Sequence, residues 1–246
     1  MMDKVKEFFQ ANRTLVKGAC FILSVAVAVL WLRSDPPVKV GPKVTSSSRV
    51  VILLHGYGAS KNDLAPLAEE MLAMAPGVSF VLPSAPHSVG SGSAWIPSFT
   101  EDTQEKADLR VIEYRKEARG IVVDIIDDLI SAGVSPSSIY VGGFSQGAAI
   151  ALDVIVNEPA AVNIGGLIFM SGGGYQMDFT QLKSHAPFRA LVSHAQSDPV
   201  VSSAMSKELV QTLKDGGHKV TFIEFDKGHT IAPPVRTALG AFLAEL

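Results

Sequence analysis

Three residues of this sequence have the types and the order that nucleophilic catalysis requires, namely Ser145, Asp198 and His229. A serine hydroxyl is a weak nucleophile at neutral pH, so it needs a neighbouring base that takes its proton. A histidine can be that base, and a carboxylate can fix the tautomer of the imidazole and stabilise its charged form. These residues therefore predict acyl transfer through a covalent intermediate on Ser145.

Ser145 lies in the motif Gly143-Phe144-Ser145-Gln146-Gly147. The apolar residues 138–141 before it predict a buried strand, and residues 148–156 after it predict a helix, so the serine falls at the turn between them. Such a turn strains the serine backbone, and the two glycines leave no Cβ to collide where strand and helix cross. The hydroxyl then points outward at the start of a helix, where N–H groups stabilise negative charge.

The acid and the base each follow a predicted strand. Asp198 comes a short loop after the apolar residues 190–193, and His229 comes after residues 220–225 and before the last predicted helix. Ligand groups collect at the carboxyl ends of parallel strands, which is where both would lie. Asp226 is the rival acid, but it precedes His229 by only three residues on the same loop, so we favour Asp198.

An acyl transfer site also needs donors for the tetrahedral oxyanion. The backbone N–H of Gln146, one residue past the nucleophile, is one candidate, and that of Tyr57, in the loop after the first strand, is the second. His55 belongs to the same loop and precedes the nucleophile, so we interpret it as structural. Trp95 lies in the long connection 84–104, where it either lines an acyl pocket or pins that connection to the core.

The other histidines lack the context of a strand end followed by a helix. We expect surface or capping roles for them: His87, His185, His194 and His218. No His or Cys cluster has metal-ligand spacing and no Gly-rich phosphate loop opens a helix, so we expect neither a metal nor a cofactor. The net charge of −3 and the absence of a basic run give no reason to expect nucleic acid as a partner.

Apolar runs of strand length alternate with amphipathic segments after residue 49. Predicted strands comprise residues 50–54, 78–82, 138–141, 166–170, 190–193 and 220–225, and predicted helices comprise residues 64–72, 105–131, 148–156, 202–214 and 231–246. This alternation predicts an α/β fold with a mostly parallel central sheet and helices on both faces.

The N-terminus carries an apolar segment, residues 15–32, interrupted only by Lys17. Four basic residues precede the uncharged part of this segment and only Arg33 follows closely, which favours a cytoplasmic N-terminus and an extracytoplasmic catalytic domain. We therefore predict a membrane anchor within residues 1–33, an irregular tether at residues 34–48 and a catalytic domain at residues 49–246. The alternatives are a signal peptide cleaved after residues 26–28, giving a secreted protein, and a buried soluble helix.

The chain also resembles a known family. The segments that carry the resemblance are Leu53-Leu54-His55-Gly56-Tyr57-Gly58, Gly142-Gly143-Phe144-Ser145-Gln146-Gly147-Ala148, Asp198-Pro199-Val200-Val201 and Gly228-His229-Thr230-Ile231. They are similar to the phospholipase/carboxylesterase family of α/β-hydrolases, which includes the acyl-protein thioesterases. The order serine, acid, histidine is also that of α/β-hydrolases.

That resemblance implies an α/β-hydrolase fold, a triad of Ser145, Asp198 and His229, oxyanion donors at Tyr57 and Gln146, and cofactor-free hydrolysis of acyl esters or thioesters. An acyl-protein thioesterase or lysophospholipase acting on membrane-associated chains is one alternative. A membrane-anchored interaction module without catalysis is the other, although binding alone would not require all three triad residues.

Overall fold

The computed structural model describes residues 35–158, 163–173 and 177–246. The predicted membrane segment, residues 15–32, lies outside the described residues, and the anchor therefore stays a prediction. Within the ranges that are described, no helix combines the length and the apolar character needed to cross a bilayer.

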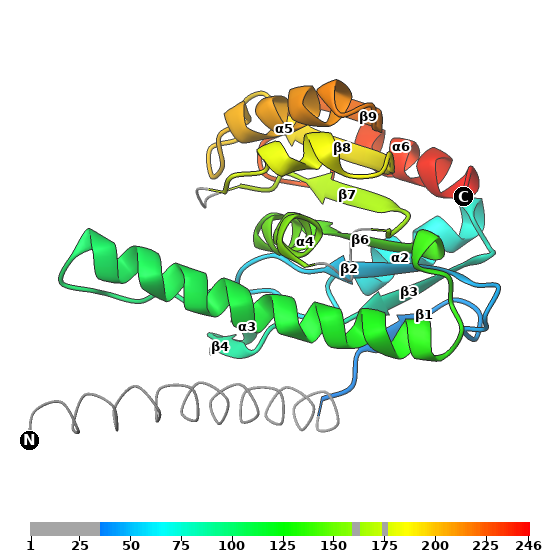
Figure 1. Cartoon of the computed structure of the whole chain (residues 1–246), viewed down its shortest axis with the longest axis horizontal. Helices are drawn as coiled ribbons and strands as arrows, with labels where there is room; N and C mark the ends of the chain where they lie inside the picture. The colour runs from blue at the N-terminus through cyan, green and yellow to red at the C-terminus, as the bar shows by residue number, and fades with distance from the viewer. Residues whose placement is uncertain (1–34, 159–162, 174–176) are drawn as a thin grey trace, which may run out of the picture. The chain divides into compact units, whose positions relative to one another are not determined.

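A mostly parallel sheet forms the centre of the folded domain (Figure 1). Its strand order is β1-β3-β2-β6-β7-β8-β9, and every neighbouring pair is parallel except β1 with β3. The strands are β1 (Val38–Val40), β2 (Arg49–Leu54), β3 (Val78–Leu82), β6 (Ile139–Phe144), β7 (Gly166–Met170), β8 (Arg189–Ala195) and β9 (Lys219–Phe225). The predicted parallel sheet is confirmed.

Helices cover both faces of this sheet, as predicted (Figure 1). The helices are α2 (Ala65–Met74), α3 (Gln104–Ser131), α4 (Gln146–Asn157), α5 (Ala204–Asp215) and α6 (Pro233–Ala244). The step from β2 to β3 runs toward one edge of the sheet, whereas the steps from β3 to β6, β6 to β7 and β8 to β9 run toward the other. Right-handed crossovers therefore place α2 on one face and α3, α4 and α5 on the opposite face, and α6 packs beside α2.

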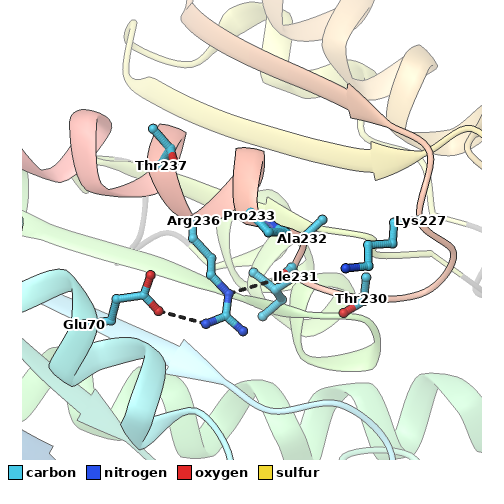
Figure 2. Close-up of a pocket in the computed structure, with 8 residues that line it drawn as sticks. All are labelled: Glu70, Lys227, Thr230, Ile231, Ala232, Pro233, Arg236 and Thr237. Carbon is cyan, nitrogen blue, oxygen red and sulfur yellow. Dashed lines mark hydrogen bonds and ion pairs between the residues drawn. The ribbon is translucent and has the colours of Figure 1, made fainter.

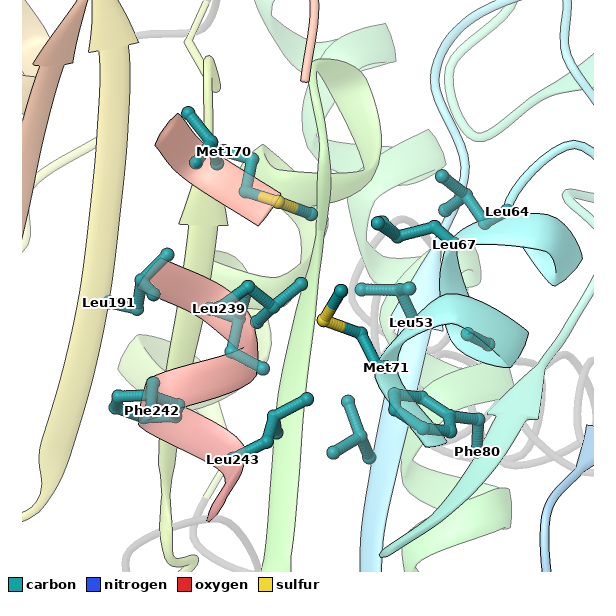
Figure 3. Packing of buried hydrophobic residues seen from close by; sticks show 14 of the residues in the cluster. Leu53, Leu64, Leu67, Met71, Phe80, Met170, Leu191, Leu239, Phe242 and Leu243 are labelled. Atoms are coloured by element: carbon teal, nitrogen blue, oxygen red, sulfur yellow. The ribbon is translucent and has the colours of Figure 1, made fainter. Parts of the chain in front are cut away.

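The core on the α2 and α6 side is continuous across the sheet (Figure 3). Met71 of α2 and Leu239 of α6 are almost fully buried and lie close to Leu53 of the central strand β2. All five apolar residues of β2 are buried, because helices cover the strand on both sides. This packing fixes the positions at which the strands end, and the site is built on those ends.

The folded domain begins earlier than predicted. Strand β1 pairs antiparallel with β3, Val38 opposite Leu82, so part of the predicted tether 34–48 belongs to the sheet and the compact unit starts at Pro37 rather than near residue 49. The strand has only three residues, half-buried valines on either side of the exposed Lys39. An edge strand so short, with Pro, Gly and Ser around it, carries too little periodicity to be recognised in sequence.

Helix α3 matches the predicted helix 105–131 almost residue for residue, but only part of it covers the sheet. Its buried residues all fall between Ala118 and Leu129. Leu109 and Ile112 are 56% and 57% exposed, because the first half of the helix extends past the sheet (Figure 1). Helical periodicity predicted which face is apolar and could not predict how far the sheet extends beneath it.

The connection 84–104 is not irregular throughout. It contains a hairpin of β4 (His87–Val89) and β5 (Gly92–Ala94), which the sequence did not reveal because each strand has only three residues. The hairpin is held against α3, since the His87 ring stacks edge-on with Tyr114 at 4.8 Å and lies 3.0 Å from the Glu117 carboxylate.

Candidate active site

Ser145 occupies a strained turn between β6 and α4. Its backbone has φ 55° and ψ −120°, in the region that favours glycine, and Gln146 begins the helix directly after it. The Ser145 N–H donates to the Met170 carbonyl of β7 at 2.9 Å, which holds the turn against the neighbouring strand. A non-glycine residue at positive φ persists only when its surroundings hold it there, and such residues cluster at functional sites.

The two glycines of the motif are required by close packing. A Cβ on Gly143 would lie 2.6 Å from the Leu54 carbonyl oxygen, and one on Gly147 would overlap that same oxygen and lie 2.6 Å from the His55 oxygen. The helix that follows Ser145 therefore touches the end of β2 backbone to backbone. The steric reason predicted for these glycines is confirmed.

The structure brings Ser145, Asp198 and His229 into one chain of hydrogen bonds. The His229 Nδ1–H donates to Asp198 Oδ2 at 2.7 Å, and Nε2 lies 2.8 Å from the Ser145 Oγ. Because the carboxylate only accepts, Nδ1 carries the proton and Nε2 is free to accept the serine hydroxyl proton. These residues come from the ends of β6, β8 and β9, as the strand-end argument required.

Asp198 is held as a carboxylate by several donors. Its side chain is 1% exposed, and Oδ1 accepts the backbone N–H groups of Val200 at 2.8 Å and Val201 at 2.9 Å. Burial raises the pKa of Asp198, but the hydrogen bonds from Val201, His229 and Val200 outweigh it, so the pKa lies below its usual range. The group beside His229 is therefore ionised at neutral pH and stabilises a positive imidazole.

Asp226, the rival acid, points elsewhere. Its carboxylate accepts a hydrogen bond from the Ser197 hydroxyl, so it ties the acid loop to the base loop without reaching His229. A second tie runs from the Gln196 N–H to the Phe225 carbonyl at 2.8 Å. The ring of Phe144 lies 4.8 Å from that of His229 and supports it from the nucleophile side.

The loop after β2 is braced by the hairpin. The Gly58 N–H donates to the Ser93 carbonyl at 2.9 Å, and the Ser93 N–H donates to Ala59 at 2.8 Å. Tyr57 lies in this loop and is 46% exposed, with its hydroxyl 2.8 Å from the Ser98 Oγ. The hairpin thus fixes the segment that carries the predicted Tyr57 donor.

His55 has the structural role that we expected. It is 1% exposed, its Nδ1–H donates to the Gly56 carbonyl at 2.8 Å, and its Nε2 accepts the Ala85 N–H at 3.1 Å. Burial lowers the pKa of His55, with smaller opposing effects from Gly56 and Asp63, so the ring is neutral and both nitrogens serve the loop.

Trp95 is fully buried, so it does not line an open pocket. Its indole N–H donates to the His55 carbonyl at 2.8 Å and its backbone N–H donates to the Gln146 side-chain oxygen at 2.8 Å. Gln146 also donates its amide N–H to the Ile96 carbonyl at 2.8 Å. Of the two interpretations of Trp95, pinning the connection to the core fits its full burial and these hydrogen bonds.

The Gln146 side chain is a functional feature that sequence reasoning missed. We had assigned a role only to its backbone N–H, at the first position of α4. A buried side-chain amide next to a nucleophile needs hydrogen-bond partners for both its oxygen and its nitrogen. That requirement could have indicated a structural role for the Gln146 side chain.

Two of the four remaining histidines are not at the surface, contrary to prediction. His218 is 6% exposed and His194 is 0% exposed, and each makes hydrogen bonds through both ring nitrogens. His87 and His185 are partly exposed. Sequence position alone did not distinguish the buried pair from the others.

A pocket of about 430 Å³ lies beside the His229 loop (Figure 2). Lys227 and Thr230, which flank His229, contribute to its wall together with residues of α6, while the triad side chains do not. Arg236 crosses it, donating to Glu70 at 2.8 Å and to the Ile231 carbonyl at 3.1 Å. The pocket therefore lies beside the loop that carries His229, and the triad side chains do not line it.

No metal site competes with this interpretation in the part of the chain that the structure describes. Among residues 35–158, 163–173 and 177–246, no group of three or more His, Cys, Asp or Glu side chains could hold a metal ion. The site combines the Ser145 hydroxyl, the His229 imidazole in the tautomer that accepts a proton at Nε2, and the buried Asp198 carboxylate.

The family model described as Phospholipase/Carboxylesterase matches residues 38–245, a span that contains all three residues and both predicted oxyanion donors. The chain belongs to this family. Its Neurospora crassa relative, named acyl-protein thioesterase 1, is 26% identical over 231 residues, which covers 87% of this chain and 93% of that protein.

A second family relative, acyl-protein thioesterase 1 of Kluyveromyces lactis, is 32% identical over 142 residues, or 55% of this chain. The matched region spans only 61% of that relative's length. The family model is described as Phospholipase/Carboxylesterase, and both relatives are named acyl-protein thioesterase 1.

Solved structures agree with the family's fold. A crystal structure of esterase PE8 is 28% identical, with a TM-score of 0.68, and covers 86% of this chain and 97% of its own. A carboxylesterase from Bacillus cereus, 22% identical with a TM-score of 0.67, covers 88% and 98% and is similar in fold.

Proposed function

We propose that the chain is a serine hydrolase that cleaves carboxylic esters or thioesters through an acyl-enzyme on Ser145. The observation that carries the proposal is the hydrogen-bonded chain from Ser145 Oγ through both nitrogens of His229 to Asp198. In this mechanism His229 takes the serine proton as the hydroxyl attacks the acyl carbon, and then gives it to the leaving group.

The tetrahedral intermediate places negative charge on the former carbonyl oxygen. We assign its stabilisation to the backbone N–H groups of Gln146 and Tyr57, because the first lies at the start of α4 and the second on the loop that the hairpin holds beside it. Water activated by His229 then attacks the acyl-enzyme, and Ser145 leaves with the proton returned to it.

Replacing Ser145 with alanine tests the mechanism. Turnover of p-nitrophenyl acetate should fall by about three orders of magnitude or more, with an unchanged circular dichroism spectrum. The matched control is Ser137→Ala, which should keep full activity, because Ser137 lies on the surface in the short helical turn before β6 with its hydroxyl 2.9 Å from that of Ser135. Full retention of turnover by Ser145→Ala would refute the Ser145 mechanism, whereas an absence of turnover in the wild-type protein would favour the non-catalytic interaction module.

The second candidate is an acyl-protein thioesterase or lysophospholipase acting on membrane-associated acyl chains. The names of the Neurospora crassa and Kluyveromyces lactis relatives favour it. A series of p-nitrophenyl esters from acetate to palmitate, measured beside matched thioesters, separates the two. A kcat/KM that rises with chain length and is higher for thioesters supports the second candidate, and a preference for short oxygen esters supports a general carboxylesterase.

We further propose that residues 15–32 anchor the protein in a membrane with the catalytic domain outside the cytoplasm. The apolar segment and the basic residues before it support this orientation. Carbonate extraction should leave the full chain in the membrane pellet and release a chain that begins at Pro37, the first residue of the compact unit. Release of a shortened chain, whose N-terminus mass spectrometry places after residue 28, would support the cleaved signal peptide instead.

A further inference from the structure

A second imidazole touches the carboxylate that serves His229. The His194 Nε2 lies 3.3 Å from Asp198 Oδ2, the same oxygen that accepts the His229 Nδ1–H at 2.7 Å. The Asp198 carboxylate therefore lies between two histidine rings. Only one of them, His229, continues to the nucleophile.

The partners of His194 determine where its proton lies. Nε2 faces two acceptors, Asp198 Oδ2 and the Val201 carbonyl at 3.0 Å, so this nitrogen must carry the hydrogen. Nδ1 is then the acceptor, and the buried Ser206 hydroxyl of α5 donates to it at 2.5 Å. His194 thus has its proton on Nε2, whereas His229 has its proton on Nδ1.

The His194 N–H also closes the turn that carries the acid. Val201 donates its own N–H to Asp198 Oδ1 at 2.9 Å, while its carbonyl accepts from His194. Val201 is therefore held through its N–H by the Asp198 carboxylate and through its carbonyl by the His194 imidazole. Ser206 in turn holds that imidazole from helix α5, so α5 reaches the acid through side chains alone.

We propose that His194 is a positioning residue that holds the Asp198 carboxylate in the rotamer required by His229. This inference rests on the proposed triad. Without the His194 N–H, the Val201 carbonyl would lose the donor that holds it and the imidazole would no longer contact Oδ2, so the turn and the carboxylate could both move.

Other charged groups near His194 do not compete with Asp198 for contact with the His194 ring. Glu224 stands opposite His194 in the register of β8 with β9, but its carboxylate pairs with Lys207 of α5 at 3.0 Å. His229 is on the far side of the Asp198 carboxylate. Asp198 is thus the acidic group that the His194 ring contacts directly among the residues that the structure describes.

Two substitutions at this position separate the N–H from the bulk of the ring. His194→Leu keeps most of the volume and removes the donor, and it should lower kcat about 10- to 100-fold with KM within about twofold of wild type. His194→Gln places an amide N–H near the former Nε2 and should recover most of kcat. A kcat for His194→Leu within twofold of wild type would overturn the proposal.

His218→Leu is the matched control. His218 is also buried and makes two hydrogen bonds, to the Phe188 N–H at 3.1 Å and to the Leu182 carbonyl at 2.7 Å, but it contacts none of the triad. It should lose stability like His194→Leu and keep kcat. If His194→Leu does not fold, Ser206→Ala replaces it, because it removes the lock on the tautomer and should lower kcat several-fold. An unchanged kcat there would also refute the role.

A double-mutant cycle shows whether His194 acts through Asp198. Asp198→Asn alone should lower kcat by about 10⁴-fold, and adding His194→Leu should then have almost no further effect on the residual rate. An equal, additive loss in that background would overturn the inference. If Asp198→Asn itself keeps wild-type kcat, the proposed triad fails and the inference fails with it. If Asp198→Asn loses activity but His194→Leu does not, the inference alone fails.

Discussion

Replacing Gly147 with alanine should impair both the nucleophile and the oxyanion donors at once. The added Cβ would lie 2.6 Å from the His55 carbonyl oxygen and overlap the Leu54 oxygen, so α4 or the end of β2 must retreat by several tenths of an ångström. Both neighbours are backbone atoms of a central strand, which cannot rotate aside as a side chain would. The displacement therefore passes into the elbow and into the loop that carries Tyr57.

The magnitude follows from these contacts. Overpacking of this kind costs about 1 to 3 kcal/mol of unfolding free energy. A shift of the reacting groups approaching about 1 Å lowers catalysis about 100-fold, so the smaller displacement at Gly147 should lower kcat about 10- to 100-fold. Urea denaturation followed by circular dichroism measures the first quantity, and turnover of p-nitrophenyl butyrate measures the second.

Gly120→Ala is the matched control for this experiment. Gly120 lies within α3, and a Cβ there would meet no atom within 4 Å. The same substitution should therefore raise the unfolding free energy by about 0.5 to 1 kcal/mol and leave kcat unchanged. Wild-type kcat in Gly147→Ala would refute the argument that close packing of α4 on β2 sets the elbow.

Three further predictions concern buried polar groups. Asp153→Ala removes the fully buried carboxylate that pairs with two arginines of α3 and should cost about 3 kcal/mol in urea denaturation. Asp215→Ala, at an exposed ion pair, should have a much smaller effect. The pKa of Asp198 is lowered in the folded state, so its carboxylate stabilises the fold above the pKa of an unfolded aspartate. This contribution is lost as pH falls through the pKa of the folded state. The unfolding free energy, measured from pH 6 to 2, should therefore fall more steeply for wild type than for Asp198→Asn. Trp95→Phe leaves the His55 carbonyl without its indole donor and should cost about 1 to 3 kcal/mol by thermal denaturation, with kcat reduced because the loop loosens.

The positions of Ser145, Asp198 and His229 after apolar runs of the sequence predicted where the site lies. Each triad residue follows an apolar run that proved to be a strand, and in a parallel sheet the ends of such runs converge at one edge. The Gly-x-Ser-x-Gly motif could be interpreted because its sterics are local, between residues that are close in sequence or in adjacent elements. Fold and triad placement were therefore predictable from local pattern and topology alone.

The parts that could not be predicted depend on contacts distant in sequence. The Gln146 side chain meets residues 95–96, some fifty positions earlier in the chain. His194 finds its hydroxyl partner on a helix that follows it. Strand β1 was missed because three residues carry almost no periodic signal. The two interpretations of Trp95 stayed open because the burial of a single aromatic residue in a loop cannot be predicted from its sequence position.

Helix α3 has consequences for dynamics that its continuous backbone does not reveal. Its second half packs on the sheet and on α4, while its first half carries surface ion pairs and the exposed Leu109 and Ile112. Local opening needs little free energy where few buried contacts are broken. Amide protons of residues 105–113 should therefore exchange with solvent much faster than those of residues 121–129, so that one helix behaves as two units of different stability, joined near the arginines that bind Asp153.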